Sequence, residues 1–229
     1  MDNELLLPKH GGYRKLKSFQ IAQLVYDLTV RFCELYVDRF SRTKDQMVQA
    51  ARSGVQNIAE GSLASGTSKK TELKLTNVAR ASLEELRLDY EDFLRQRGVP
   101  MLEPGHPAMV RFRRRRCASL EAVQEWVRKE RGTNTDPHGR ARTDTDSQSR
   151  ETSVRVRVSP CSSVFNSSSV PSSSSVSSSA LVANAALSLL NLCCHLLDRQ
   201  IAAQAAAFAQ DGGFSERLYR VRSRNRKKF

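Results

Sequence analysis

Residues 61–70, GSLASGTSKK, have the glycines, hydroxyls and lysines of a loop that binds phosphate. A nucleotide-binding P-loop follows a buried strand and has a lysine directly after its second glycine, so that the lysine reaches the outer phosphates. Here two hydroxyl residues separate Gly66 from the lysines, and the preceding residues have helical spacing. We therefore interpret this stretch as a turn, in which Gly61 ends one helix and Ser68 caps the next.

Metal chemistry has little support in the sequence. A di-iron site in a helical bundle needs Glu-x-x-His on two helices and further glutamates from the other two. The one such spacing, Glu103 to His106, contains a proline and a glycine that interrupt a helical face. The other histidines have no partner series; they are His10, His138 and His195. We predict no metal and no cofactor.

A group of carboxylates lies along the expected third helix. Opposite a leucine stripe such side chains usually form a solvated face, offset by arginines three or four residues away. No histidine, cysteine or serine base accompanies them, so we predict no catalytic residue and no enzyme activity. The carboxylates are Glu84, Glu85, Asp89, Glu91 and Asp92, and the arginines are Arg80, Arg87 and Arg95.

The five cysteines are odd in number, and none form a Cys-x-x-Cys motif. This argues against a disulfide framework and against a zinc site. No signal peptide is recognisable, because acidic residues occupy the start where a signal needs positive charge. We expect a protein of the reducing cytoplasm.

Basic side chains are the strongest functional candidates. The formal net charge is +13, which favours an anionic partner such as nucleic acid. Antiparallel packing of the first three expected helices would bring residues 14–17 and 69–74 to one end of the molecule. The predicted nucleic-acid-binding residues are Arg14, Lys15, Lys17, Arg52, Lys69, Lys70, Lys74, Arg220, Arg222 and Arg224. No aromatic residues interleave with them, so the pattern indicates contacts to phosphates without stacking on bases. Ordinary solvation of charged residues is the alternative.

Four segments with helical periodicity must position these residues. They are residues 18–40, 43–60, 69–97 and 180–210. The second has a small inward face at Ala50, Ala51 and Gly54, and the third has a stripe from Leu75 to Leu94. We predict an all-α, up-down four-helix bundle with a long insertion between the third and fourth helices. The expected divisions are 12–98 for three helices, 99–179 for the insertion, 180–212 for the fourth helix and 213–229 for a basic C-terminal tail.

The insertion differs in composition from the rest. A surface helix with a weak apolar side, formed by Leu120, Val123, Trp126 and Val127, is expected near its start. The serine-rich residues 159–179 cannot bury enough apolar surface to offset chain entropy. We therefore expect the insertion to be mostly disordered.

The segment 180–197 has no formal charge and reaches the lower length limit of a membrane span. It contains Asn184, Asn191 and His195, which are costly in hydrocarbon. A helix that is apolar nearly all round is otherwise buried in a bundle or in an oligomer interface. We expect no membrane contact and a homo-oligomer whose interface includes this helix.

A family resemblance rests mainly on residues 41–95. QMVQAARSGVQNIAEG, followed shortly by ARASLEEL, resembles the four-helix-bundle proteins encoded by intervening sequences in bacterial large-subunit ribosomal RNA genes. GGYRKL and the late DGGFSERLYR resemble more closely the four-helix-bundle suffix proteins of that family. The accessory variability protein of diversity-generating retroelements is a more distant relative. The insertion 99–179 departs from the family pattern.

The resemblance implies a bundle fold, ring-like homo-oligomers that are pentamers in characterised relatives, and no known catalysis. The accessory relatives bind nucleic acid and a reverse transcriptase through basic surfaces. Our leading hypothesis is therefore a non-enzymatic, oligomeric helical protein that binds RNA or DNA through phosphate contacts. The alternative is a scaffold that binds another protein, such as a polymerase, without contacting nucleic acid.

Overall fold

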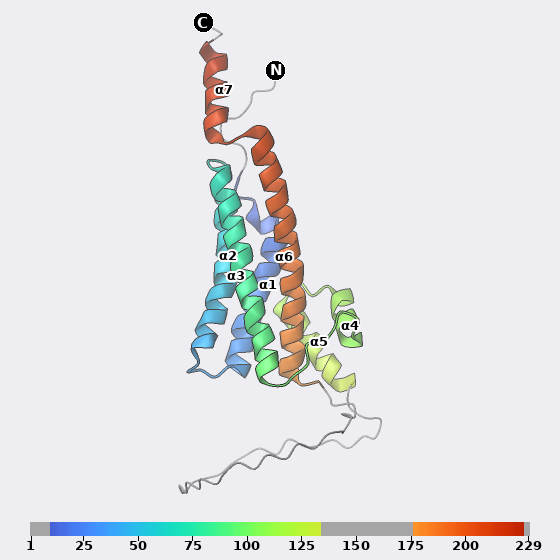
Figure 1. Ribbon diagram of the computed structural model, residues 1–229. Coiled ribbons are helices and arrows are strands. Elements are labelled where there is room, and N and C mark those ends of the chain that lie inside the picture. Colours follow the sequence, from blue (N-terminus) through green and yellow to red (C-terminus); the bar gives the residue numbers. More distant parts are fainter. Residues whose placement is uncertain (1–9, 134–175, 227–229) are drawn as a thin grey trace, which may run out of the picture.

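The computed structural model describes residues 10–133 and 176–226, and these form helices and connections without a strand. The all-α class is therefore confirmed for the part of the chain described. The elements are a 3-10 turn, η1, and seven α-helices (Figure 1). Their bounds are η1 Tyr13–Lys15, α1 Lys17–Tyr36, α2 Arg42–Ala64, α3 Lys69–Gln96, α4 Pro107–Arg115, α5 Leu120–Thr133, α6 Ser178–Asp211 and α7 Phe214–Arg226.

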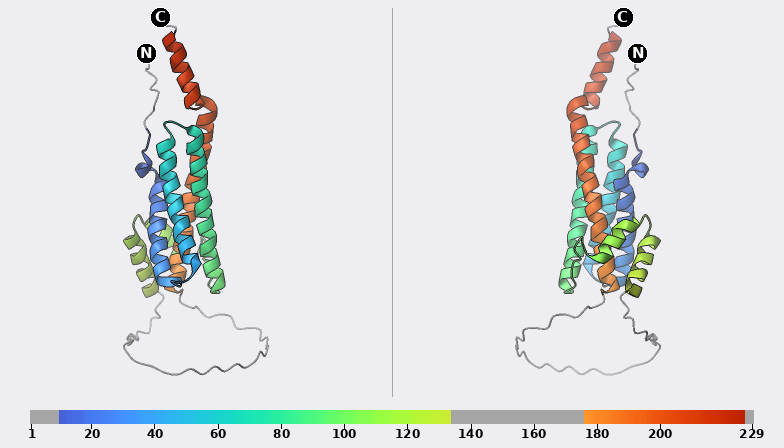
Figure 2. Two further views of the ribbon diagram at one scale, coloured as in Figure 1. Left: turned by 90° about the vertical axis from the view of Figure 1, so that its left-hand side faces the viewer. Right: turned by 90° about the vertical axis from the view of Figure 1, so that its right-hand side faces the viewer.

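The four long helices α1, α2, α3 and α6 lie side by side, and each packs against two of the others (Figures 1 and 2). The second half of α6 meets the start of two of them. Ser18 in α1 donates a hydrogen bond to Gln200 at 2.9 Å, and Gln204 donates to Glu72 in α3 at 3.2 Å. α6 therefore runs antiparallel to α1 and to α3. The helix count exceeds the expected four, because α4, α5 and α7 are additional.

The turn between α2 and α3 differs in one detail from the prediction. Ser68 caps α3 as expected, accepting a hydrogen bond from the Thr71 amide at 3.2 Å. Gly61, however, does not end α2, which continues to Ala64. Gly61 is buried, and a Cβ there would lie 3.3 Å from the carbonyl oxygen of Glu72. Its role is close helix packing.

The core follows the predicted helix faces. In α2 the buried residues include Ala50, Ala51 and Gly54. In α3 they include Leu83 and most of the predicted stripe. Phe32 is at the centre of an aromatic group, with its ring centroid 4.9 Å from that of Tyr90 and 4.7 Å from that of Phe93. The 3.6-residue period of these helices thus predicts their buried faces correctly.

Residues 107–133 are folded, where the sequence predicted one surface helix within a mostly disordered insertion. They form two helices, α4 and α5, which pack against α6, and α5 also contacts α1. Val123, Trp126 and Val127 are buried, and the ring of Phe112 lies 4.8 Å from that of Trp126. The expected weak apolar side of a surface helix is therefore part of the core. The remainder of the expected disordered segment, residues 134–175, lies outside the described residues.

α6 is buried along its first half, where its side chains fill the centre of the bundle. Among the described residues one helical stretch, Ser178–Ser223, could cross a membrane by length and composition, and 72% of its most apolar window is buried inside the protein. The second half of α6 extends past the start of α1 and exposes several alanines. Residues 214–226 form the helix α7, where the sequence predicted a tail.

Candidate nucleic-acid interface

Two predicted basic groups do meet at one end of the molecule. The amide of Gly11 donates a hydrogen bond to the carbonyl of Ser62 at 3.1 Å, which ties the chain before η1 to the end of α2. Gly66 in the following turn lies against His10, since a Cβ on Gly66 would be 2.8 Å from the imidazole Nδ1. η1 and the start of α3 therefore share one end. We call their basic side chains the basic end: Arg14, Lys15, Lys17, Lys69, Lys70 and Lys74.

The basic residues before and at the start of α1 are exposed. The guanidinium of Arg14 lies 5.4 Å from the ring centroid of Tyr13, and Nζ of Lys17 donates to Oε1 of Gln20 at 3.1 Å. Lys15 follows on the same 3-10 turn. All three charges therefore stay in contact with solvent, where a phosphate could reach them.

The lysines of α3 are not equivalent. Nζ of Lys69 lies 3.0 Å from Oε2 of Glu72, and both side chains are largely shielded from solvent. Oε1 of Glu72 also accepts the hydrogen bond from Gln204. Lys70 and Lys74 are exposed. Glu72 offsets part of the charge of Lys69. Lys70 and Lys74 are therefore better placed than Lys69 to bind an anion.

The structure does not bring the remaining predicted residues into this group. Arg52 is exposed near the middle of α2, along the side of the bundle. Arg220 and Arg222 lie on α7, beyond the end of the four long helices (Figure 1). Arg220 donates a hydrogen bond to the carbonyl of Asp211, the last residue of α6, at 2.8 Å. Arg224 is also on α7, and its side chain is outside the described part of the chain.

Sequence reasoning missed a second basic surface, on α4. The run RFRRRR at residues 111–116 is visible in the sequence, but its segment was expected to be a surface helix in a disordered insertion. Arg113, Arg114 and Arg116 are exposed and line an open hollow of about 660 Å³ together with Val110. We call these three side chains and the space between them the arginine hollow. A cluster of three arginines has the donor geometry that binds phosphate oxygens.

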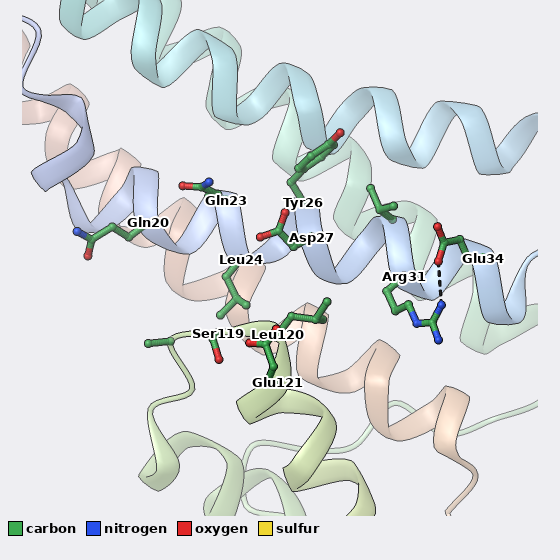
Figure 3. Close-up of a pocket in the computed structure, with 12 residues that line it drawn as sticks. Gln20, Gln23, Leu24, Tyr26, Asp27, Arg31, Glu34, Ser119, Leu120 and Glu121 are labelled. Atoms are coloured by element: carbon green, nitrogen blue, oxygen red, sulfur yellow. Dashed lines mark hydrogen bonds and ion pairs between the residues drawn. The ribbon is translucent and has the colours of Figure 1, made fainter.

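A polar groove of about 680 Å³ separates α1 from the start of α5 (Figure 3). Asp27 on α1 and Glu121 on α5 both line it. Burial raises the pKa of Asp27, and the negative charge of Glu121 raises it further. Arg31 in the same groove is paired with Glu34 at 3.0 Å. Its acidic character makes this groove unsuited to a polyanion.

The carboxylates expected to form a solvated face are mostly paired with basic groups. Arg87 pairs with Glu84, and Arg95 pairs with Asp92 at 2.8 Å. Arg80 reaches across to Asp198 of α6. Burial raises the pKa of Asp89, and two neighbouring acids add to the effect. These contacts stabilise the helices.

Of the histidine and cysteine side chains considered for chemistry, His106 acts as a helix cap, and Cys33 and Cys193 lie buried. Nδ1 of His106 caps α4, accepting a hydrogen bond from the amide of Ala108 at 3.3 Å. Burial raises the pKa of the Cys33 thiol to about 11 and that of Cys193 to about 12. Such thiols carry little thiolate at neutral pH. Within residues 10–133 and 176–226 no group of three or more His, Cys, Asp or Glu side chains could hold a metal ion.

Comparison of the chain with protein-family models, with curated proteins and with solved structures gives no match. We therefore infer function from the charge and geometry of the basic surfaces.

Proposed function

We propose that this protein is a non-enzymatic helical protein that binds nucleic acid, RNA or DNA, through its basic surfaces. The observation that supports the proposal is the grouping of six basic side chains at one end, from two segments more than fifty residues apart in the sequence. Glu72 is the acid paired with this group, through Lys69. A polyanion that approaches this end meets concentrated positive charge.

The proposed contacts are to phosphates. Lysines and arginines without interleaved aromatic rings neutralise the backbone but do not stack on bases. Binding of this kind is largely independent of sequence, and it weakens steeply as salt rises because bound counterions are released. α7 adds further arginines beyond the basic end and would extend the contact.

We further propose that α1, α2, α3 and α6 are an up-down four-helix bundle related to the intervening-sequence proteins of bacterial ribosomal RNA genes. The motifs in residues 41–95 support this relation. A homo-oligomer, such as the pentamer that the resemblance implies, would then bring several basic ends together in the cytoplasm. Light scattering at micromolar concentration tests the assembly, and a monomer there would rule it out.

A protein-binding scaffold is the alternative, and one observation favours it. The second half of α6 exposes small apolar side chains beyond the start of α1, which a protein partner such as a polymerase could cover. The exposed alanines are Ala202, Ala203, Ala205, Ala206 and Ala209. Apolar contacts depend weakly on salt, in contrast to phosphate contacts.

The test is fluorescence anisotropy with a labelled 20-nucleotide RNA and a labelled 20-base-pair DNA duplex over a series of salt concentrations. The variant K69Q/K70Q/K74Q removes three charges from the basic end. We expect the slope of log affinity against log salt to fall by up to about 2–3, at roughly 0.7–0.9 per lost phosphate contact.

A matched control removes three exposed arginines outside both basic surfaces. The variant R31Q/R39Q/R95Q has the same net charge as the lysine variant, so it accounts for the loss of overall charge. We expect it to retain the wild-type slope to within one unit. A wild type that binds neither probe, or binds with no salt dependence, would contradict the proposed function and favour the scaffold.

A further inference from the structure

We propose that the arginine hollow on α4 is a second phosphate-binding site, and that a nucleic-acid duplex contacts it together with the basic end. The ligand class rests on the proposed function. The site itself rests on three observations. Some arginines of α4 are paired with α5 while others are exposed, Arg116 has an unusual backbone conformation, and α4 has a defined position relative to η1.

Two of the five arginines in residues 111–116 hold α4 to α5. Arg111 forms a bidentate pair with Glu130, from Nε to Oε1 at 2.7 Å and from Nη2 to Oε2 at 2.6 Å, and only 5% of the Glu130 side chain is exposed. Arg115 pairs with Glu125, which also binds Lys129 at 3.0 Å. Arg111 and Arg115 are four residues apart and so share the helix face toward α5.

The other three arginines lie off that face. Arg113, Arg114 and Arg116 are exposed and line the same hollow. Arg113 donates a hydrogen bond to the carbonyl of Pro104, which fixes its direction while its other N–H groups remain available. Glu125 and Glu130 of α5 are thus paired with Arg111, Arg115 and Lys129. The three arginines of the hollow are exposed, and no carboxylate is among the residues that line it.

Arg116 has a backbone conformation that normally selects glycine. It ends α4 with φ 49° and ψ 53°, the left-handed region, and is the only non-glycine residue with positive φ among those described. Glycine adopts this conformation at helix ends without strain. Such outliers cluster at functional sites, so the conformation of Arg116 supports a functional role for its side chain. At Arg116 the side chain completes the arginine hollow.

The platform beneath the hollow is well fixed. Phe112 and Met109 are buried, and the ring contact between Phe112 and Trp126 joins α4 to α5. The amide of Leu102, just before α4, donates to Oδ1 of the buried Asn184 at 2.7 Å. The arginines are therefore carried on a short helix that is anchored to α6, and little ordering is needed when an anion binds.

The α4–α5 pair and η1 project from the same side of the long helices in Figure 2, and both α5 and η1 contact α1. Arg113 shares a groove with Ser188 of α6, whereas Ser18 at the start of α1 bonds to Gln200. Ser188 and Gln200 are twelve residues apart on α6, which is about 18 Å along the helix axis.

This axial separation favours a duplex as the ligand. A duplex with one phosphate per strand every 3.4 Å covers about 18 Å in roughly five base pairs, so a longer duplex has the length to reach from one site to the other. A small polyphosphate could occupy only one of them. No exposed aromatic ring lies among the residues of the hollow, so a base-stacked single strand has no platform there.

The experiment measures the binding of a 20-base-pair duplex by anisotropy over a salt series, for the full chain. We compare the wild type, R113Q/R114Q/R116Q, K69Q/K70Q/K74Q and the charge-matched control R31Q/R39Q/R95Q. The arginine variant should lower the salt slope by up to about 2–3, and combining it with the lysine variant should lower the slope further. The control should stay close to wild type.

Since Arg113 bonds to Pro104, the variant R114Q/R116Q keeps that contact and guards against misfolding; it should lower the slope by up to about 2. Circular dichroism and thermal melting verify the fold of each. A wild-type slope in R114Q/R116Q, with a reduced slope in the lysine variant, overturns this inference but leaves the proposed function in place. No duplex binding by the wild type overturns both.

Tripolyphosphate, titrated alone by calorimetry, distinguishes the two sources of phosphate. We expect it to bind at least ten-fold more weakly than the duplex at equal salt, because it cannot span both sites. Equal affinity, lost in R113Q/R114Q/R116Q, would mean that the hollow binds a small free anion, and it would overturn the assignment to a duplex.

Discussion

Gly54 in α2 and Leu83 in α3 are in direct contact, so close that a Cβ on Gly54 would lie 2.6 Å from Cδ2 of Leu83. Leu83 is fully buried, so it cannot move aside without displacing other core residues. The absence of a side chain at Gly54 therefore sets the distance between the two helices. The neighbouring hydrogen bond between the hydroxyls of Ser53 and Ser82, at 3.0 Å, depends on the same approach.

The variant G54A should destabilise the fold. Alanine gains up to about 1 kcal/mol in helix propensity, but overpacking a filled core typically costs about 1–3 kcal/mol. We expect a net loss in urea denaturation. The double variant G54A/L83A should show positive coupling, because the truncated leucine leaves room for the new methyl group. Gly105, with no atom within 4 Å of its Cβ position, is the control, and G105A should be close to neutral. Unchanged stability in G54A would show that the helices separate readily.

Stability should fall at alkaline pH. Burial raises the pKa of Cys193 to about 12, and those of Cys33 and Cys194 to about 11, from 9.0. Burial also raises the pKa of Tyr90. Above pH 9 the unfolded chain therefore loses protons that the folded chain retains, and folding becomes less favourable as pH rises from about 9 to 11.

Urea midpoints at pH 8, 9 and 10 measure this decline. The slope per fully ionising thiol is at most about 1.4 kcal/mol per pH unit. The variant C193A should show a shallower decline between pH 9 and 10 than the wild type, whatever its stability at pH 8. C117A is the comparison: burial also raises the pKa of the partly buried Cys117, but less, so its pH curve should change less than that of C193A. Parallel pH curves for the wild type and C193A would contradict the assigned cause.

Asn184 should control the attachment of the chain before α4. Its amide group donates to the carbonyl of Ala180 at 2.8 Å, and its Oδ1 accepts from Leu102. N184A leaves the partly buried Leu102 amide without its acceptor, which costs up to about 1–3 kcal/mol. Hydrogen exchange should become faster in α4 and α5 than in α3. Asn191 is exposed on the same helix, and N191A should leave the exchange pattern unchanged.

Replacing Arg116 by glycine should stabilise the fold. R116G removes the left-handed strain and should stabilise the fold by up to about 1 kcal/mol in thermal melts. R114G, inside the same short helix, should instead destabilise it by roughly 0.5–1 kcal/mol. A loss of stability in R116G would mean that the side chain itself holds the end of α4.

The helix faces that sequence predicts best are those with long, local periodicity. Leu83, Leu86, Tyr90 and Phe93 repeat every three or four residues, and all four are buried. Their pattern needs no knowledge of the partner helix. The same holds for the cap at Ser68, whose hydrogen bond to Thr71 spans three residues.

The α4–α5 pair could not be predicted in this way. Its apolar residues are few and stand among arginines, and the surface that buries them is on α6, more than fifty residues later. The pairing of Arg111 with Glu130 depends on a reversal at Arg116, a residue type that does not signal a left-handed turn. A basic run in which two of five arginines form internal ion pairs has the same composition as one in which all five are solvated.

The candidate site was predicted in part. The meeting of η1 with the start of α3 follows from two chain reversals, which short connections signal. The inequality among Lys69, Lys70 and Lys74 arises from Glu72, whose position is fixed by Gln204 of α6. Arg52 was predicted as a binding residue by its charge alone, and its position near the middle of α2 puts it away from this end.

The overhang of α6 has a mechanical consequence. Gln200 is level with the start of α1, so the eleven residues up to Asp211 extend about 16 Å past it with no α1 beside them. Within this segment Gln204 donates to Glu72, so α3 still holds α6 at that point, and the seven residues from Gln204 to Asp211 extend about 10 Å further. A tilt of about 10° at Gln204 would move the far end of α6 by about 2 Å over that length. The arginines of α7 would move with it, whereas the lysines of α3 belong to a packed helix.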